Sequence, residues 1–219
     1  MKYDKYSSLV NTPRSGWVKR NLSQKESILD HMYLCWLIGA LHLPLELEGD
    51  DYTEEQKKEY SKETILNLLL IHDLGEADAG DIIRGNKTPR DKLVEHNSIY
   101  SFIQDLKLDH SNTDYFSLWE TMENRHKDNI NTWIAKEIDI IQGTHRYFAY
   151  VTEGNVTWSN REEASAAVDE WFQDITNENI TSPIGRIIRS ELIINNQRFL
   201  KHTKELKELF AIYSEKYNL

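Results

Sequence analysis

The sequence predicts an all-α protein, and three observations support this class. Its 219 residues include only 9 glycines and 4 prolines, so few residues interrupt a helix. Long stretches carry apolar residues at the three- and four-residue spacing of an amphipathic helix. Only the segment 153–160 has room for a short extended piece, and nothing else alternates as a strand does. We therefore expect a single compact bundle of about seven or eight helices.

The first two long helices each have a local start signal. Ser23 and Glu26 form the pattern of a capping box, which predicts a helix from there to about Leu41. The next helix is predicted for residues 61–73, where apolar residues recur along one face and end at a histidine. Both helices are apolar enough to lie in the core.

The later helices follow from the same two kinds of evidence. Thr88 followed by Pro89 is an N-cap followed by a proline at the first helical position, which predicts a helix to about Leu106. The remaining periodic segments predict helices for residues 112–125, 129–150, 160–174 and 183–217, the last broken near Asn195 and Asn196.

The chain is predicted to be one domain over residues 1–219. It contains no internal repeat, low-complexity tract or linker, and its length suits one domain. Hydrophobic residues make up 39% of the chain, with 6 tryptophans, 11 tyrosines and 6 phenylalanines, so a sizeable core is available. We expect the core of the domain at about residues 10–145 and a helical extension at 146–219.

The charge and the cysteine content exclude several classes of protein. The formal net charge of −10 argues against binding to polymeric nucleic acid or to an anionic membrane, both of which require a basic face. No segment approaches the roughly 18 apolar residues of a membrane span, and the start of the chain lacks the apolar stretch of a signal peptide. The single cysteine, Cys35, cannot form an intramolecular disulfide and is interpreted as a buried, inert thiol. We therefore expect a cytoplasmic protein.

Four dispersed side chains are candidates for a metal site. His31 lies inside an apolar helix, His72 and Asp73 end the next long helix, and Asp139 is flanked by isoleucines. Two imidazoles and two carboxylates suit a divalent ion, and a carboxylate is costly to bury unless it is paired or bound to a metal. Other interpretations remain: a hydrogen-bonded core histidine, an acid that merely ends a helix, and a salt bridge between Asp139 and Lys136. Zinc-protease spacing, a Gly-rich phosphate loop and a GxSxG turn are absent from the sequence.

Three segments resemble one known family. "TPRSGWVKRNLSQKESILDHM", "LLIHDLGEADAGDI" and "WIAKEIDIIQ" are similar, in this order, to segments of HD-domain metal-dependent phosphohydrolases of the 5'-deoxynucleotidase branch. The resemblance covers about residues 10–145. It implies a compact all-helical protein, typically a homodimer, that removes phosphate from deoxyribonucleoside 5'-monophosphates with a divalent ion.

The resemblance also implies a role for individual residues. The metal ligands would be His31, His72, Asp73 and Asp139, with Mn²⁺, Co²⁺, Mg²⁺, Fe²⁺ and Zn²⁺ all acceptable to such donors. The catalytic acids beside the substrate would be Glu76 and Asp81, which Gly75 lets turn back toward the same cavity by ending the helix. A bound divalent ion lowers the pKa of a water ligand and screens the phosphate oxygens. Glu76 is the candidate for proton transfer, and Asp81 for orienting the sugar or the leaving group.

The substrate contacts are predicted on the same basis. Trp17 matches an aromatic residue of the substrate pocket, although it could equally serve as a staple on the first helix. Some members carry arginine directly before that tryptophan, where this chain has Gly16, so phosphate contact would fall to Arg14 or Arg20. Three other functions stay open: a deoxynucleoside triphosphate hydrolase, a (p)ppGpp-type hydrolase, and a non-catalytic nucleotide-binding dimer.

Overall fold

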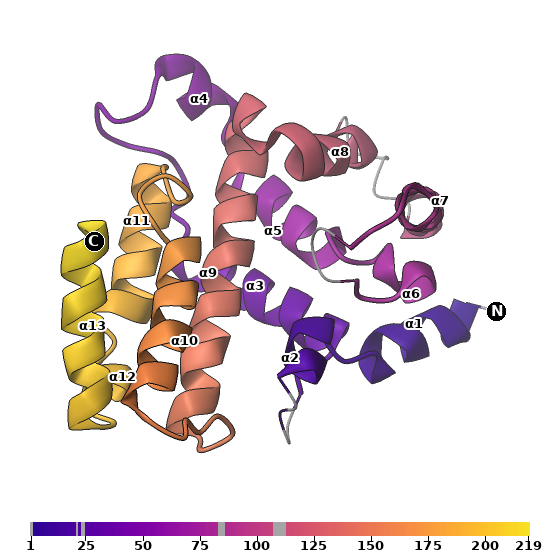
Figure 1. Cartoon of the computed structure of the whole chain (residues 1–219). Helices are drawn as coiled ribbons and strands as arrows, with labels where there is room; N and C mark the ends of the chain where they lie inside the picture. The colour runs from indigo at the N-terminus through magenta and orange to yellow at the C-terminus, as the bar shows by residue number, and fades with distance from the viewer. Residues whose placement is uncertain (1, 21, 23–24, 83–85, 107–112) are drawn as a thin grey trace. The chain divides into compact units, whose positions relative to one another are not determined.

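The computed structural model describes residues 2–20, 22, 25–82, 86–106 and 113–219, and its regular elements are helices (Figure 1). Within these described residues the only extended pairing is an isolated bridge between Pro13 and Ser27. The predicted all-α class is confirmed, and short helices accompany the long ones that we expected. None of the described helices is both long enough and apolar enough to cross a membrane.

The chain divides into two compact units, Met1–Ala135 and Lys136–Leu219. The first unit contains α1 (Lys2–Asn11), α2 (Ser15–Lys19), α3 (Ile28–His42), α4 (Glu54–Glu59), α5 (Lys62–Ile71), α6 (Glu76–Ala79), α7 (Pro89–Leu106), α8 (Tyr115–Arg125) and the short 3₁₀ helix η2 (His126–Asp128). Helix α9 (Ile130–Thr152) starts in this unit and continues into the next. The second unit adds α10 (Arg161–Asp174), α11 (Pro183–Arg189), the π-helical turn η3 (Ser190–Ile194), α12 (Gln197–Leu200) and α13 (Lys204–Tyr217).

Most predicted helix boundaries agree with the structure to within a few residues. Helix α7 begins at Pro89, α9 and α10 begin one residue after their predicted starts, and the C-terminal segment breaks at Asn195 and Asn196. Residues 153–160 form turns and bends before α10 and contain no strand. The predicted helix at 112–125 begins at Tyr115, and its residue 112 lies outside the described part of the chain.

The start of α3 differs from the prediction. Its capping box is formed by Ser27 and Asp30: the Ser27 hydroxyl accepts a hydrogen bond from the Asp30 backbone N–H, and the Asp30 carboxylate accepts one from that of Ser27. Ser23, the predicted cap, lies outside the described residues. Both serines are followed by an acid three residues later, so the local pattern does not distinguish the two starts.

The core of the first unit is formed where α3 packs on α5. Met32 of α3 and Leu68 and Leu69 of α5 are buried there. Gly39 allows the close approach, since a β-carbon at this position would lie 2.9 Å from Leu69 Cδ1. The packing fixes the ends of both helices, and with them the two histidines they carry.

The second unit has an aromatic core. Phe148, Phe172, Phe199 and Phe210 are fully buried, and the rings of Phe148 and Phe210 are 4.7 Å apart. In Figure 1, α10 and α13, which carry two of these rings, run side by side. The prediction of a single domain over 1–219 stays a prediction.

Candidate metal centre

Helices α3 and α5 bring two histidines together from positions 41 residues apart. His31 lies on the buried side of α3, and His72 is the C-cap residue of α5. Their Nε2 atoms are 3.2 Å apart, and each residue is only 1% exposed. Two imidazole nitrogens therefore face each other in a site shielded from solvent.

A backbone carbonyl group sets the tautomer of His72. Its Nδ1 lies 2.9 Å from the carbonyl oxygen of Leu69, and since a carbonyl can only accept, Nδ1 carries the proton. The Nε2 atom then has its lone pair directed at His31. This is the arrangement by which proteins orient metal-binding histidines. The indole N–H of Trp119 donates to the carbonyl of His72 over 2.9 Å and holds the same turn.

A carboxylate oxygen completes a set of three donors. Asp73 Oδ2 lies 3.6 Å from His31 Nε2 and 3.5 Å from His72 Nε2. Ligands that bind one ion at about 2.0–2.2 Å are separated by roughly 3.0–3.6 Å for the usual angles at the metal. The three distances match that size, and two imidazoles with one carboxylate suit a divalent transition ion. The residues present therefore fit the metal that the sequence predicts.

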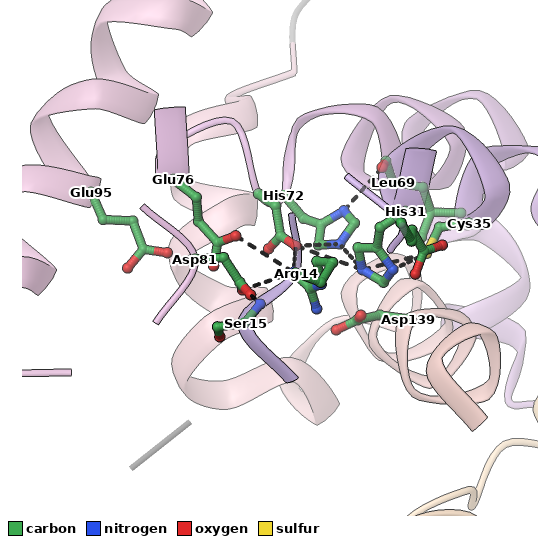
Figure 2. A network of polar contacts seen from close by, with 12 residues as sticks. Arg14, Ser15, His31, Cys35, Leu69, His72, Glu76, Asp81, Glu95 and Asp139 are labelled. Atoms are coloured by element: carbon green, nitrogen blue, oxygen red, sulfur yellow. Dashed lines mark hydrogen bonds and ion pairs between the residues drawn. The ribbon is translucent and has the colours of Figure 1, made fainter. Parts of the chain in front are cut away.

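Arg14 lies beside this set among three acids (Figure 2). Its Nη1 is 2.5 Å from Asp73, 3.3 Å from Asp81 and 3.5 Å from Glu76. The backbone N–H of Ser15 also donates to the Asp81 carboxylate, so the loop that begins α2 is held against the acids. The predicted catalytic acids and one predicted phosphate contact thus lie together.

Glu76 has the most strongly perturbed carboxyl group of the cluster. It is almost fully buried at the start of α6. Burial first, and then the charge of Asp73, raise the pKa of Glu76, while Arg14 acts in the opposite direction. Burial and the charge of Asp73 thus favour the protonated form of Glu76, which is the form that a general acid requires.

Sequence reasoning missed a lysine and an acid next to Glu76. Lys87 Nζ lies 2.8 and 2.9 Å from the two carboxylate oxygens of Glu95, and 3.5 Å from Glu76 Oε1. Glu95 is buried on the same side of α7 as Ile99 and Phe102, so helical periodicity was a signal for it. Nothing in the local sequence pointed to Lys87.

Gly75 has a different role from the predicted one. Its φ of −60° and ψ of −27° are ordinary right-handed helical values, which any residue adopts. A β-carbon at this position would lie 2.7 Å from Glu95 Cγ and 2.8 Å from the Glu95 carbonyl oxygen. The glycine is needed for space between α6 and α7, not to end a helix.

The other two predicted substrate contacts, Trp17 and Arg20, contact neighbouring residues of their own segment. Trp17 is 5% exposed, and its indole N–H donates to Glu26 over 3.0 Å. Arg20 Nη1 is 3.5 Å from the carbonyl oxygen of Gly16. Their contact with a substrate stays a prediction.

Asp139 belongs to the second unit. It lies on α9 next to the fully buried Ile138, and Lys136 Nζ is 3.0 Å from its Oδ2. The salt bridge considered from the sequence is therefore present. The role of Asp139 as a metal ligand stays a prediction.

Comparison with known proteins identifies related sequences. A family model described as "HD domain" matches residues 6–176. A protein of Dictyostelium discoideum named 5'-deoxynucleotidase HDDC2 is 32% identical over 122 residues, which cover 52% of this chain and 58% of that protein. The Danio rerio protein of the same name is 30% identical over 135 residues, with 61% and 60% covered. The 5'-deoxynucleotidase hdd1 of Schizosaccharomyces pombe is 23% identical over 185 residues, with 80% and 87% covered. The matches to the first two thus span about three fifths of those relatives.

Proposed function

The chain belongs to the HD-domain family, and we propose that it is a metal-dependent phosphohydrolase that removes the phosphate of deoxyribonucleoside 5'-monophosphates. The observation that carries this proposal is the set of His31, His72 and Asp73, whose donor atoms lie 3.2–3.6 Å from one another. The names of the relatives support the choice of substrate.

We propose His31, His72, Asp73 and Asp139 as the ligands of one divalent ion. A bound divalent ion supplies a water ligand of lowered pKa and screens the charge of the phosphate. The Leu69 carbonyl keeps the lone pair of His72 Nε2 available for such an ion.

The other acids and Arg14 act on the substrate in this proposal. Glu76, whose pKa is raised by burial and by the charge of Asp73, donates a proton to the departing 5'-oxygen. The guanidinium of Arg14 lies beside Asp73 and Asp81. A phosphate bound next to these acids would accept two hydrogen bonds from this guanidinium. Asp81, held by the N–H of Ser15, orients the sugar. Trp17 and Arg20 remain proposed contacts to the base and to the phosphate.

The test is phosphate release from metal-stripped protein to which Mn²⁺, Co²⁺, Mg²⁺, Fe²⁺ or Zn²⁺ is returned. The substrates are dAMP, dGMP, dCMP, dTMP and dUMP, beside AMP, dATP and ppGpp. We expect metal-dependent release from the deoxymonophosphates and slower release from AMP. Asp73→Ala should lower the rate by at least about 100-fold, since even residues that only hydrogen-bond to the ligands of a metal contribute about 10–100-fold. Asp50→Ala, which removes an exposed acid, is the matched control.

Two results would overturn this assignment. Faster turnover of dATP or ppGpp would leave the proposed metal site unchanged, but it would assign the protein to one of the alternative hydrolase classes. Absence of release from every compound would favour a nucleotide-binding protein without catalysis.

We further propose a cytoplasmic homodimer without polymeric nucleic acid or membrane partners. The net charge of −10 supports a small substrate rather than an anionic polymer or membrane. Leu29, Tyr33 and Leu41 lie on one side of α3 with their side chains exposed, and an apolar face of this kind is typical of an interface. Light scattering should give about 52 kDa, twice the 25.8 kDa of one chain, and Tyr33→Lys should lower it. A wild-type mass near 26 kDa would exclude the dimer.

A further inference from the structure

Cys35 lies next to the metal ligands on α3. It follows His31 by four residues, one turn of the helix, so both side chains occupy the same face. Its Sγ is 3.8 Å from Nε2 and 3.9 Å from Nδ1 of His31, and the residue is fully buried. The thiol therefore lines the metal site and does not merely pack in the hydrophobic core.

The distances suit a sulfur ligand. One donor atom from each of His31, Cys35 and His72 lies within 4.8 Å of the others. An ion about 2.0–2.1 Å from nitrogen and about 2.3 Å from sulfur, with angles of about 90–110° at the ion, separates two nitrogens by about 2.9–3.3 Å and nitrogen from sulfur by about 3.1–3.6 Å. The observed separations are 3.2 Å between the two Nε2 atoms and 3.8 Å between His31 Nε2 and the sulfur. Both agree with that geometry to about 0.2 Å.

The surroundings favour coordination in a second way. His72 is fixed with its Nε2 lone pair toward His31 by its Nδ1–H bond to Leu69. A thiolate beside two neutral imidazoles is a donor set that selects Zn²⁺, Co²⁺ or Fe²⁺ over Mg²⁺, which prefers oxygen.

We propose that Cys35 is an additional ligand of the metal centre and makes it a site for a borderline transition ion such as Zn²⁺ or Co²⁺. The proposal rests on the metal centre of the proposed function and extends it to a residue outside the HD signature. On binding, the S–H bond breaks, a sulfur–metal bond forms, and the proton leaves to the solvent. The oxidation state of sulfur and metal does not change.

The experiment is the absorption spectrum of the full-length protein, stripped of metal and titrated with Co²⁺. We expect ligand-field bands in the visible and a sulfur-to-cobalt charge-transfer band in the near ultraviolet. Cys35→Ser and Cys35→Ala should lose the near-ultraviolet band and keep bands in the visible. His72→Ala should weaken both. Circular dichroism of each variant shows that it is folded, and the alanine variant avoids burying an extra hydroxyl.

Affinity measurements give an independent result. Cys35→Ala should weaken Zn²⁺ binding by about tenfold or more and change Mg²⁺ binding by less than about twofold. Co²⁺ bound to the wild type without a near-ultraviolet band would overturn the role of Cys35 and leave the metal centre intact. Absence of Co²⁺ binding to the wild type would overturn the metal centre itself, and the cysteine proposal with it.

Discussion

Replacing Gly75 with alanine tests the contact that positions Glu76. The backbone at Gly75 is compatible with alanine, so in the folded protein the effect of the new methyl group is steric. That methyl would lie 2.7 Å from Glu95 Cγ and 2.8 Å from the Glu95 carbonyl oxygen, where ordinary contacts begin at 3.4 Å. Helices α6 and α7 must therefore separate by about 0.6 Å, the difference between 3.4 and 2.8 Å, because the carbonyl oxygen belongs to the backbone and cannot rotate away.

The size of the effect follows from two opposing contributions. Overpacking of this kind lowers the free energy of unfolding by about 1–3 kcal/mol. Replacing a glycine raises it by about 0.4–1 kcal/mol, because the unfolded chain then has less conformational entropy. We expect the free energy of unfolding to fall by about 1.3 kcal/mol, and at most by about 2.6 kcal/mol, which lowers Tm by about 3–5 °C, and at most by about 10 °C, at 2–4 °C per kcal/mol. Since a misplacement near 1 Å can cost about 100-fold in rate, phosphate release should fall by about 10- to 100-fold.

Gly16→Ala is the matched control in the same unit. A β-carbon at Gly16 meets no atom within 4 Å, so the same substitution should leave Tm unchanged or raise it slightly. Both variants are unfolded by urea and by heat and followed by circular dichroism, beside the phosphate-release assay. If Gly75→Ala is as stable and as active as Gly16→Ala, the close contact with Glu95 does not position Glu76.

Three further predictions concern ionisable groups that are fully or partly buried. Burial first, and then two neighbouring arginines, lower the pKa of His145 from 6.5 to about 4, so its contribution to stability is complete above pH 6.5 and falls, by at most about 3 kcal/mol, as pH drops toward 4. His145→Gln should flatten the dependence of Tm on pH in this range. Glu137, fully buried, accepts hydrogen bonds from the backbone N–H groups of Thr181 and Ser182, and Glu137→Gln should lower stability by about 2–3 kcal/mol. Lys87→Met leaves the Glu95 carboxylate buried without its ammonium partner and should cost about 3–5 kcal/mol, whereas Lys87→Arg should recover most of it.

Each of these has a result that contradicts it. An unchanged slope of Tm against pH in His145→Gln would remove the histidine as the cause. Full stability of Glu137→Gln would mean that the α11 start does not depend on a charged acceptor. If Lys87→Met and Lys87→Arg lose the same amount of stability, packing and not charge holds Glu95 in place.

The helices could largely be predicted from the sequence because their signals are local. Periodicity of apolar residues and caps such as Thr88 with Pro89 act within one or two turns, so α7, α9 and α10 agree closely with expectation. The predicted start of α3 was wrong for a local reason too, since two successive capping patterns, Ser23 with Glu26 and Ser27 with Asp30, are both present and only the folded chain selects Ser27. The candidate metal ligands His31, His72 and Asp73 could likewise be predicted from the sequence. The family resemblance that identifies them depends only on the order of residues along the chain.

Contacts between helices were decided by tertiary structure alone. The 3.2 Å approach of His31 to His72 depends on how α3 crosses α5 at Gly39, and no local pattern encodes a crossing angle. The same holds for the 3.5 Å approach of Lys87 Nζ to Glu76 Oε1, because Glu76 begins α6 and Lys87 lies just before α7. The sequence thus determined which side chains are available and on which helices they lie. Packing determined which of them meet, because side chains from distant segments approach to within 3–4 Å only when whole helices fit together.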